Sequence, residues 1–224
     1  MENTLLKLPK IQFTNQVKNY YPDILTDDAL AFITALHENF NAQRLTLLKN
    51  REVQQKIFDR GGFPEFPKET TIIREGKWTA GEIPKDLQDR RVEITGPADR
   101  KMIINALNSG AKTFMADLED SNSPTWDNSI QGQQNLLDTN KKTISLVDTK
   151  RGKSYTLNNE TAVLLVRPRG LHLNERHILI ENEEVSGSIV DFGLYVFHNT
   201  KTMLENDTAP YFYLPKLEHY TEAR

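Results

Sequence analysis

The pattern of hydrophobic and polar positions divides the chain into a helical first part and a later part in which strands and helices alternate. Thr26 precedes two aspartates, which predicts a helix start because a threonine oxygen can accept from free backbone N–H groups and acids favour the first turn. Helical spacing continues up to Phe40 and over residues 42–60, where Gly61 and Gly62 end it. One helical stripe holds Leu30, Ile33, Leu36, His37 and Phe40, and the apolar positions of the second stretch are Leu45, Leu48, Val53 and Ile57.

Residues 63–90 follow without a regular period. Prolines at 64, 67 and 84 and glycines at 76 and 81 favour turns in this stretch. The aromatic side chains of Phe63, Phe66 and Trp78 give it apolar surface to bury. We therefore expect an irregular crossing segment that packs on the rest of the protein.

From Arg91 onward, short runs typical of strands alternate with helical patterns. Strands are expected at residues 92–95, 112–118, 162–166 and 211–214. A helix that follows a turn at Gly96 and Pro97 is expected to bury Met102, Ile103, Ala106 and Leu107. A later helix is expected to start at Ser188, with Asp191 as a capping partner.

A short helix at 126–137 and a hairpin at 144–157 are expected to interrupt this alternation. Parallel strands need a crossover of about a dozen or more residues, which helices commonly supply. The alternation of strands and helices therefore predicts an α/β fold with a parallel sheet.

Charged side chains stand at the ends of two predicted strands. Side chains alternate along a strand, so Asp117 and Glu119 share one face, and Arg167 shares a face with the inward positions of its own strand. Lys216 follows the fourth strand with the same parity if the chain stays extended through Pro215. Charge at the end of a buried strand is costly in free energy unless it is paired with an opposite charge or binds a ligand. The residues alone leave two explanations open, a functional site and a structural ion pair between strands.

Composition excludes several classes of protein. A net charge of -3 and a pI near 6.0 give no electrostatic reason to expect binding to nucleic acid or to an anionic membrane. The absence of cysteine excludes disulfides, thiolate metal sites and a cysteine nucleophile. His172 and His177 alone do not make a zinc site, and no dinucleotide or P-loop motif occurs. With no signal-peptide or membrane-helix pattern, a cytoplasmic location is expected.

Several blocks of the sequence resemble, in family order, malate synthase of the shorter, A-type form. They are residues 73–97 (IREGKWTAGEIPKDLQDRRVEITGP), 114–128 (FMADLEDSNSPTWDN), 163–172 (VLLVRPRGLH), 187–199 (GSIVDFGLYVFHN) and 210–218 (PYFYLPKLE). The resemblance implies a (β/α)₈ TIM barrel clasped by an N-terminal helical domain.

The expected domains are a helical clasp with its crossing segment at 1–90 and a barrel part at 91–224, which carries a helix and hairpin insertion at about 124–160. Only four barrel strands can be counted, and a whole barrel usually takes about 250 residues. The chain is therefore expected to be the N-terminal part of the enzyme, apparently truncated in the middle of the barrel.

The resemblance also implies roles for single residues. Arg167 matches the arginine that polarises the aldehyde of glyoxylate and helps to hold the enolate of acetyl-CoA. Asp117 and Glu119 match carboxylates beside the Mg²⁺, where ordering of its water ligands is the expected task. Ser121 lies where the family approaches the coenzyme A arm. The direct Mg²⁺ ligands and the catalytic base are expected in later segments, so no direct metal ligand is assigned in this chain.

Two charged neighbours are expected to have other tasks. Asp120 has the opposite parity, and we expect it to cap the turn with Ser121 and Asn122. Arg169 lies beyond Pro168, and we expect it to form a loop ion pair or to contact a phosphate.

The implied function is that of malate synthase, a transferase of the glyoxylate bypass beside the tricarboxylic acid cycle. The enzyme condenses acetyl-CoA with glyoxylate and water in a Mg²⁺-dependent Claisen reaction that yields malate and coenzyme A. One alternative is a citrate-lyase-like carbon–carbon lyase, and another is a non-catalytic fragment or binding module. The expected partners are the two small substrates, and the 224 residues alone are expected to be inactive and to self-associate through an open sheet edge.

Overall fold

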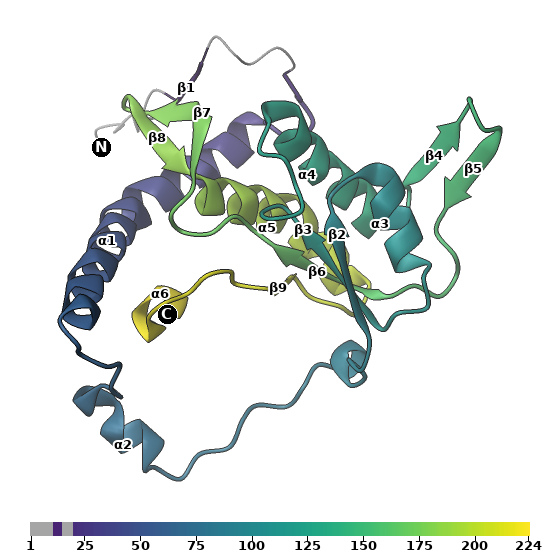
Figure 1. Cartoon of the computed structure of the whole chain (residues 1–224). Helices are drawn as coiled ribbons and strands as arrows, with labels where there is room; N and C mark the ends of the chain where they lie inside the picture. The colour runs from purple at the N-terminus through teal and green to yellow at the C-terminus, as the bar shows by residue number, and fades with distance from the viewer. Residues whose placement is uncertain (1–10, 15–19) are drawn as a thin grey trace, which may run out of the picture.

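A four-stranded parallel sheet lies at the centre of the computed structural model, which describes residues 11–14 and 20–224 (Figure 1). Its strands, in hydrogen-bonded order, are β2 (Glu93–Pro97), β3 (Thr113–Asp117), β6 (Val163–Arg167) and β9 (Tyr211–Phe212). All three pairings are parallel. The four predicted strands are confirmed, although β9 is shorter than expected.

Three helices return the chain between these strands. They are α3 (Arg100–Leu107), α4 (Trp126–Asn140) and α5 (Gly187–Glu205). Their buried faces share one apolar core with the sheet, which includes Ile103, Ile104, Leu107, Phe114, Leu136, Leu164, Val166 and Tyr195. The predicted hairpin is also present as β4 (Ser145–Asp148) and β5 (Lys153–Thr156), joined by a turn in which Gly152 has a positive φ.

Two details of the predicted start of the barrel were wrong. Gly96 and Pro97 belong to β2, and Asp99 caps α3 by accepting from the N–H of Met102 at 3.0 Å. The helix buries Ile104 beside three of the four predicted residues, and Met102 is exposed.

The predicted helical start of the chain is one long helix, α1 (Asp27–Asp59), capped by the Thr26 hydroxyl, which accepts from the N–H of Ala29. Its first half packs on α5 (Figure 1). From Phe40 onward the helix passes beyond α5, and the expected stripe fails. Asn41 and Arg44 are buried there, and four predicted apolar positions are exposed, namely Phe40, Leu45, Val53 and Ile57. None of the helices in the described part of the chain is long and apolar enough to cross a membrane.

A second sheet was not predicted. It consists of β1 (Ile11–Phe13), β7 (Asn174–Ile180) and β8 (Glu183–Ser186), all antiparallel, with a tight turn at Glu181 and Asn182. Glu175 and His177 at buried positions of β7 hide its strand pattern, because polar residues stand where apolar ones are expected. The sheet packs with α1, α4 and α5 around a second core that includes Ile24, Leu30, Ile33, Trp126, Ile130, Ile178, Val185 and Leu194.

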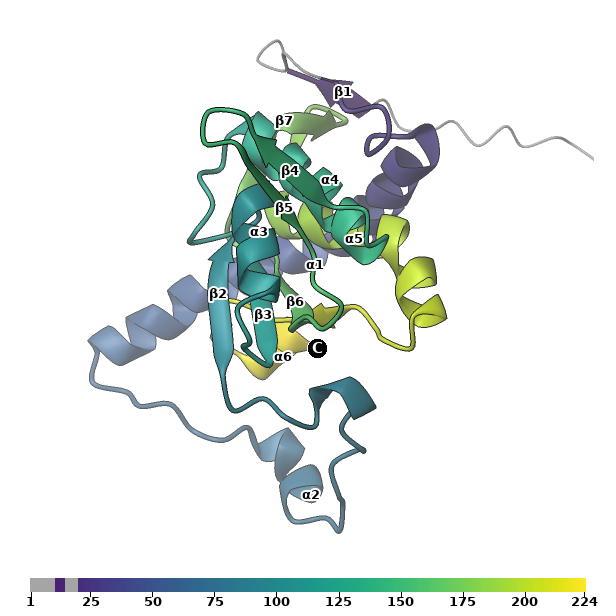
Figure 2. The same ribbon diagram turned by 90° about the vertical axis from the view of Figure 1, so that its right-hand side faces the viewer.

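The crossing segment is irregular, as predicted, but its aromatic side chains are not buried. It holds two short 3₁₀ helices (Lys68–Thr70 and Lys85–Leu87) and α2 (Thr71–Arg74). Phe63, Phe66 and Trp78 are 83%, 80% and 67% exposed, because this segment stands away from the sheet (Figure 2). The last helix, α6 (Tyr220–Ala223), contacts α1, where Arg51 binds Glu222 at 2.7 Å.

Candidate active site

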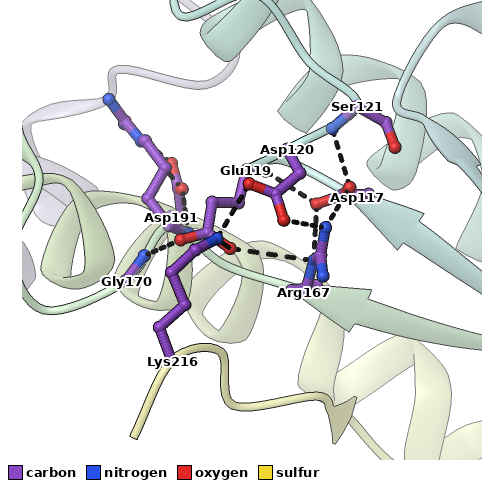
Figure 3. Close-up of polar contacts among 9 residues, drawn as sticks. Asp117, Glu119, Asp120, Ser121, Arg167, Gly170, Asp191 and Lys216 are labelled. Atoms are coloured by element: carbon purple, nitrogen blue, oxygen red, sulfur yellow. Dashed lines mark hydrogen bonds and ion pairs between the residues drawn. The ribbon is translucent and has the colours of Figure 1, made fainter.

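The centre of the site is an ion pair between the last residues of two neighbouring strands. Asp117 ends β3 and Arg167 ends β6, and the two residues are direct partners in the register of the parallel pair. The guanidinium binds the carboxylate with two hydrogen bonds, Nε to Oδ1 at 2.8 Å and Nη2 to Oδ2 at 2.6 Å (Figure 3). The register thus converts two strand-end charges into a bidentate pair, the geometry in which arginine holds a carboxylate most firmly.

Asp117 also shapes the turn that follows β3. Its oxygens accept from the backbone N–H groups of Glu119 and Ser121, each at 2.8 Å. Burial raises the pKa of Asp117, but the hydrogen bonds from Arg167, Ser121 and Glu119 outweigh burial and hold that pKa below its usual value. Asp117 therefore caps this turn as a carboxylate. The prediction that Asp120 would cap it was wrong.

Asp120 instead turns toward the cations. Its carboxylate accepts from Arg167 Nη2 at 3.0 Å and from Lys216 Nζ at 2.8 Å (Figure 3). The hydrogen bond from Lys216 lowers the pKa of Asp120, and the bonds to Asp120 and Glu119 raise the pKa of Lys216. Lys216 has a positive φ of 51°, so the chain is not extended beyond β9, yet its long side chain still reaches both acids.

Glu119 is buried between the strand ends. Its Oε1 accepts from the backbone N–H of Gly170 at 3.2 Å, and its Oε2 lies 2.9 Å from Lys216 Nζ and 3.9 Å from Arg167 Nε. Glycine favours this contact, because a Cβ at Gly170 would lie 2.9 Å from Glu119 Oε1 and 2.8 Å from the ring of His172 and would force these side chains to shift. Glu119 thus connects the turn after β3 with the turn after β6.

The structure therefore brings together three residues that parity placed on corresponding faces, Asp117, Glu119 and Arg167. The side chain of Arg167 is 16% exposed, and within the described part of the chain its Nη1 has no hydrogen-bond partner. The guanidinium is thus fixed along one edge and can offer the remaining nitrogen to an oxygen of a ligand. A fixed cation of this kind can stabilise negative charge that develops on a carbonyl oxygen.

Arg169, two residues later, is fully committed to the protein. It binds Asp191 on α5 and Glu175 on β7, with 2.8 Å between Nη2 and Asp191 Oδ1 and between Nη1 and Glu175 Oε2. Burial lowers the pKa of Arg169, but the two carboxylates outweigh burial and raise it. The loop ion pair is confirmed, and Asp191 belongs to it instead of capping α5.

The carboxylates present do not fit a directly bound Mg²⁺. Each oxygen of Asp117 already accepts two hydrogen bonds, and Glu119 and Asp120 are both paired with Lys216. In residues 11–14 and 20–224, no cluster of three or more His, Cys, Asp or Glu side chains could hold a metal ion.

Two parts of the site escaped the sequence analysis. Gly170, the last residue of the RPRG turn, donates its N–H to Glu119, and the carboxylate of Asp191 on α5 accepts from the N–H of Arg169. The only sequence signal was the glycine directly after Arg169, since a backbone that approaches another group closely favours glycine.

The fold is α/β: a helical N-terminal part is followed by a parallel sheet with returning helices and charged residues at the carboxyl ends of its strands. This is the arrangement of a partial (β/α)₈ barrel. Two family models match the chain, the malate synthase N-terminal domain over residues 10–72 and the malate synthase TIM barrel domain over residues 163–224.

Curated relatives agree with these models. The chain is 55% identical over 204 residues to malate synthase of Myxococcus xanthus (strain DK1622), 56% over 203 residues to a bifunctional glyoxylate cycle protein of Caenorhabditis elegans, and 52% over 208 residues to glyoxysomal malate synthase of Zea mays. These matches include 91%, 90% and 91% of this chain and 38%, 21% and 37% of the relatives. The chain belongs to the malate synthase family, and it spans about two fifths or less of the length of these relatives.

Proposed function

We propose that this chain is part of a malate synthase and that it supplies the arginine that holds glyoxylate. The observation that carries the proposal is the position of Arg167, which is locked by Asp117 along one edge and has Nη1 without a partner among the described residues. The family supports the reaction, a condensation of acetyl-CoA with glyoxylate and water to malate and coenzyme A. The glyoxylate cycle in the name of the Caenorhabditis relative is in keeping with this role.

In the proposed reaction, a base removes a proton from the methyl group of acetyl-CoA, and the resulting enolate attacks the aldehyde carbon of glyoxylate. Hydrolysis of the thioester then releases malate and coenzyme A. Arg167 binds the aldehyde oxygen and stabilises the negative charge that forms on it when the new carbon–carbon bond forms. Asp117 keeps the guanidinium in one orientation, so little reorganisation is needed at that step. We assign the base to no residue of this chain.

Other roles stay predictions from the family. Glu119 is proposed to support the Mg²⁺ site through its water ligands, and Asp117 is proposed to support that site by holding the turn that carries Glu119. Ser121 is proposed to contact the coenzyme A arm. We also propose a division near residue 90 between the clasp with its crossing segment and the barrel part, whose insertion lies at about 124–160. A cytoplasmic location stays a prediction, since some relatives are named glyoxysomal; cell fractionation with a tagged protein decides it.

The alternatives make different predictions. A citrate-lyase-like enzyme would cleave a carbon–carbon bond and would release no coenzyme A from acetyl-CoA when glyoxylate is added. A non-catalytic module would do neither. The helical clasp, which citrate-lyase-like barrels usually lack, and the relatives at 52–56% identity favour malate synthase.

The test measures glyoxylate-dependent release of coenzyme A from acetyl-CoA as free thiol, with and without Mg²⁺. It uses the full-length protein, by which we mean a polypeptide of the relatives' length that carries this chain. We expect release that requires both glyoxylate and Mg²⁺. Absence of thiol release under these conditions would contradict the proposed function, and release without Mg²⁺ would contradict the metal requirement.

A further inference from the structure

A buried cluster of charged and polar side chains lies directly behind the turn that follows Arg167. It consists of Arg169, Glu175, His177 and Asp191, which we call the Arg169 cluster, and each of these residues is 4% exposed or less. The members come from the turn after β6, from β7 and from α5. None of them is used in the proposed reaction. Buried charge in such a place requires an explanation, because taking several charges out of water is costly.

Asp191 has a property that Glu175 lacks. Its carboxylate binds the Arg169 guanidinium, with Oδ2 to Nε at 2.9 Å and Oδ1 to Nη2 at 2.8 Å, and Oδ2 also accepts from the backbone N–H of Arg169 at 2.9 Å. Glu175 binds only the side chain of Arg169, through Nη1, and otherwise accepts from His177. Asp191 therefore fixes the main chain of the turn as well as its side chain.

The main chain that Asp191 holds lies between two groups of the candidate active site. Arg167 lies two residues before the held N–H, and Gly170, the next residue, donates its N–H to Glu119. A shift of the backbone at Arg169 would therefore move the origin of the Arg167 side chain and lengthen the hydrogen bond to Glu119. Arg44 on α1 supports the same turn from another side, since its Nη1 donates to the carbonyl of Leu171 at 2.7 Å.

Close packing leaves this arrangement little freedom. Gly187, the first residue of α5, faces the Arg169 side chain, and a Cβ added there would lie 2.9 Å from Nε and 3.1 Å from Cζ. The helix that carries Asp191 can approach the arginine only because this position has no side chain. The guanidinium therefore has one place to lie, between Asp191 and Glu175.

We propose that Asp191 is a positioning residue for the reaction. Its carboxylate holds the main chain at Arg169, and through this turn it sets the place of Arg167 and the contact between Gly170 and Glu119. The inference rests on the proposed function. It goes beyond that function because it assigns a role in turnover to a residue of α5 that touches neither substrate nor any reacting atom.

The test compares Asp191→Asn with Glu175→Gln in the full-length protein. Each change removes one negative charge from the Arg169 cluster, but only Asp191→Asn replaces one of the acceptor oxygens that hold the turn with a donor. We expect Asp191→Asn to lower kcat roughly 10- to 100-fold, a loss typical of small displacements of a reacting group, with little change in KM for acetyl-CoA. We expect Glu175→Gln to lower the thermal midpoint and to leave kcat within about twofold of wild type, a change of under half a kcal/mol.

A second readout does not depend on activity. Amide hydrogen exchange at Arg169 and Gly170 should become faster in Asp191→Asn than in wild type and stay slow in Glu175→Gln, while exchange in α4 stays the same in all three. If the wild-type protein releases no coenzyme A, the proposed function fails, and the exchange comparison still decides whether Asp191 holds the turn. Wild-type kcat in Asp191→Asn, or equal loss of kcat and equal exchange in the two variants, would overturn the inference.

Gly187→Ala is the second variant in case Asp191→Asn does not fold. It keeps every charge, but its methyl group displaces the Arg169 guanidinium from Asp191. The inference then requires a lower kcat and faster exchange at Arg169 and Gly170. A folded Gly187→Ala protein with wild-type kcat and exchange would contradict it.

Discussion

Arg167 and Arg169 stand two residues apart on one turn, yet their surroundings give them different tasks. Arg167 lies at the carboxyl end of β6, partly exposed, with Asp117 along one edge of its guanidinium. Arg169 is enclosed, and two carboxylates from α5 and β7 occupy it. At the scale of the residue, the difference is one of free hydrogen-bonding capacity: only the first arginine can offer an N–H group to a substrate.

We expect Arg167→Lys in the full-length protein to lower kcat by about 100-fold or more, and to raise KM for acetyl-CoA far less. Lysine keeps the charge but loses the planar fork, and removal of one group that stabilises an oxyanion typically costs this much. Steady-state kinetics measure the effect, and Arg169→Lys is the control. It should lower kcat less, because the Arg169→Lys change leaves the backbone N–H that Asp191 holds, and the thermal midpoint more, because the buried carboxylates lose their guanidinium partner. Equal effects on kcat would mean that Arg167 has no special role.

The pKa of Asp117 makes its contribution to stability depend on pH. Hydrogen bonds depress this pKa in the folded protein relative to the unfolded chain, where an aspartate titrates near pH 4. The stabilisation is therefore present above about pH 4 and is lost as the pH falls through the lower, folded-state value.

We expect Asp117→Asn to lower the stability at pH 7 by on the order of 3 kcal/mol, since it leaves Arg167 without its main partner. Thermal midpoints at pH 7, 5 and 3 provide the measurement. The difference in thermal midpoint between wild type and Asp117→Asn should become smaller only at pH 3. Asp23→Asn, at an exposed carboxylate, is the control and should show no such difference. If the difference in thermal midpoint between wild type and Asp117→Asn stays constant down to pH 3, the ionised carboxylate of Asp117 is not the source of the stabilisation.

At the scale of the element, contact between α1 and α5 joins the helical N-terminal part to the sheet. The two helices approach closely at Gly193, where an added Cβ would lie 3.2 Å from Leu36 and 3.3 Å from Ile33. Packed cores resist such added volume because neighbouring side chains leave their preferred rotamers to admit it. The place of α5 relative to α1 thus depends on one position without a side chain.

Gly193→Val should destabilise the protein by about 1–3 kcal/mol, the usual cost of overpacking a close contact. Gly81→Val is the matched control, because a Cβ at Gly81 meets nothing within 4 Å and φ there is not positive. The thermal midpoint of each variant measures the effect. Equal midpoints for the two variants would show that the α1–α5 contact can relax without cost.

At the scale of the whole molecule, the sheet has two open edges, β2 and β9. Large apolar side chains are exposed near both edges, including those of Val92, Tyr213, Leu214 and Leu217. The crossing segment at residues 63–90 adds three exposed aromatic side chains, those of Phe63, Phe66 and Trp78. Unpaired strand edges and exposed apolar surface favour association with other chains.

A polypeptide of residues 1–224 alone is therefore expected to associate and to show no malate synthase activity. Its four strands do not close a barrel, and no residue among them is assigned as the base. Light scattering measures its association, and the thiol assay measures its turnover. A polypeptide that corresponds to the remaining part of the relatives, added in trans, should restore turnover by completing the sheet. Turnover by residues 1–224 alone would contradict both the assignment and the expected inactivity.

Much of the local structure could be predicted from single segments. The cap at Thr26, the four parallel strands, the hairpin with its turn near Gly152 and the shared face of Asp117 and Glu119 all depend on periodicity and turn chemistry within a few residues. The predictions that failed concern burial, which depends on contacts with distant parts of the chain. Phe63, Phe66 and Trp78 carry no signal that tells whether a partner surface lies beside them, so burial was expected where the structure shows exposure.

The sequence by itself determined the helical start, the alternation of strands and helices, and the strand ends at which charge stands, because these follow from the chemistry of neighbouring residues. Only the tertiary structure decided which charges meet. The register that places Asp117 opposite Arg167, the approach of Lys216 to Glu119, and the pairing of Asp191 with Arg169 instead of with its own helix end all join segments far apart in the chain or on different elements. A spacing rule describes neighbours along the chain, whereas these contacts depend on how strands and helices pack in space.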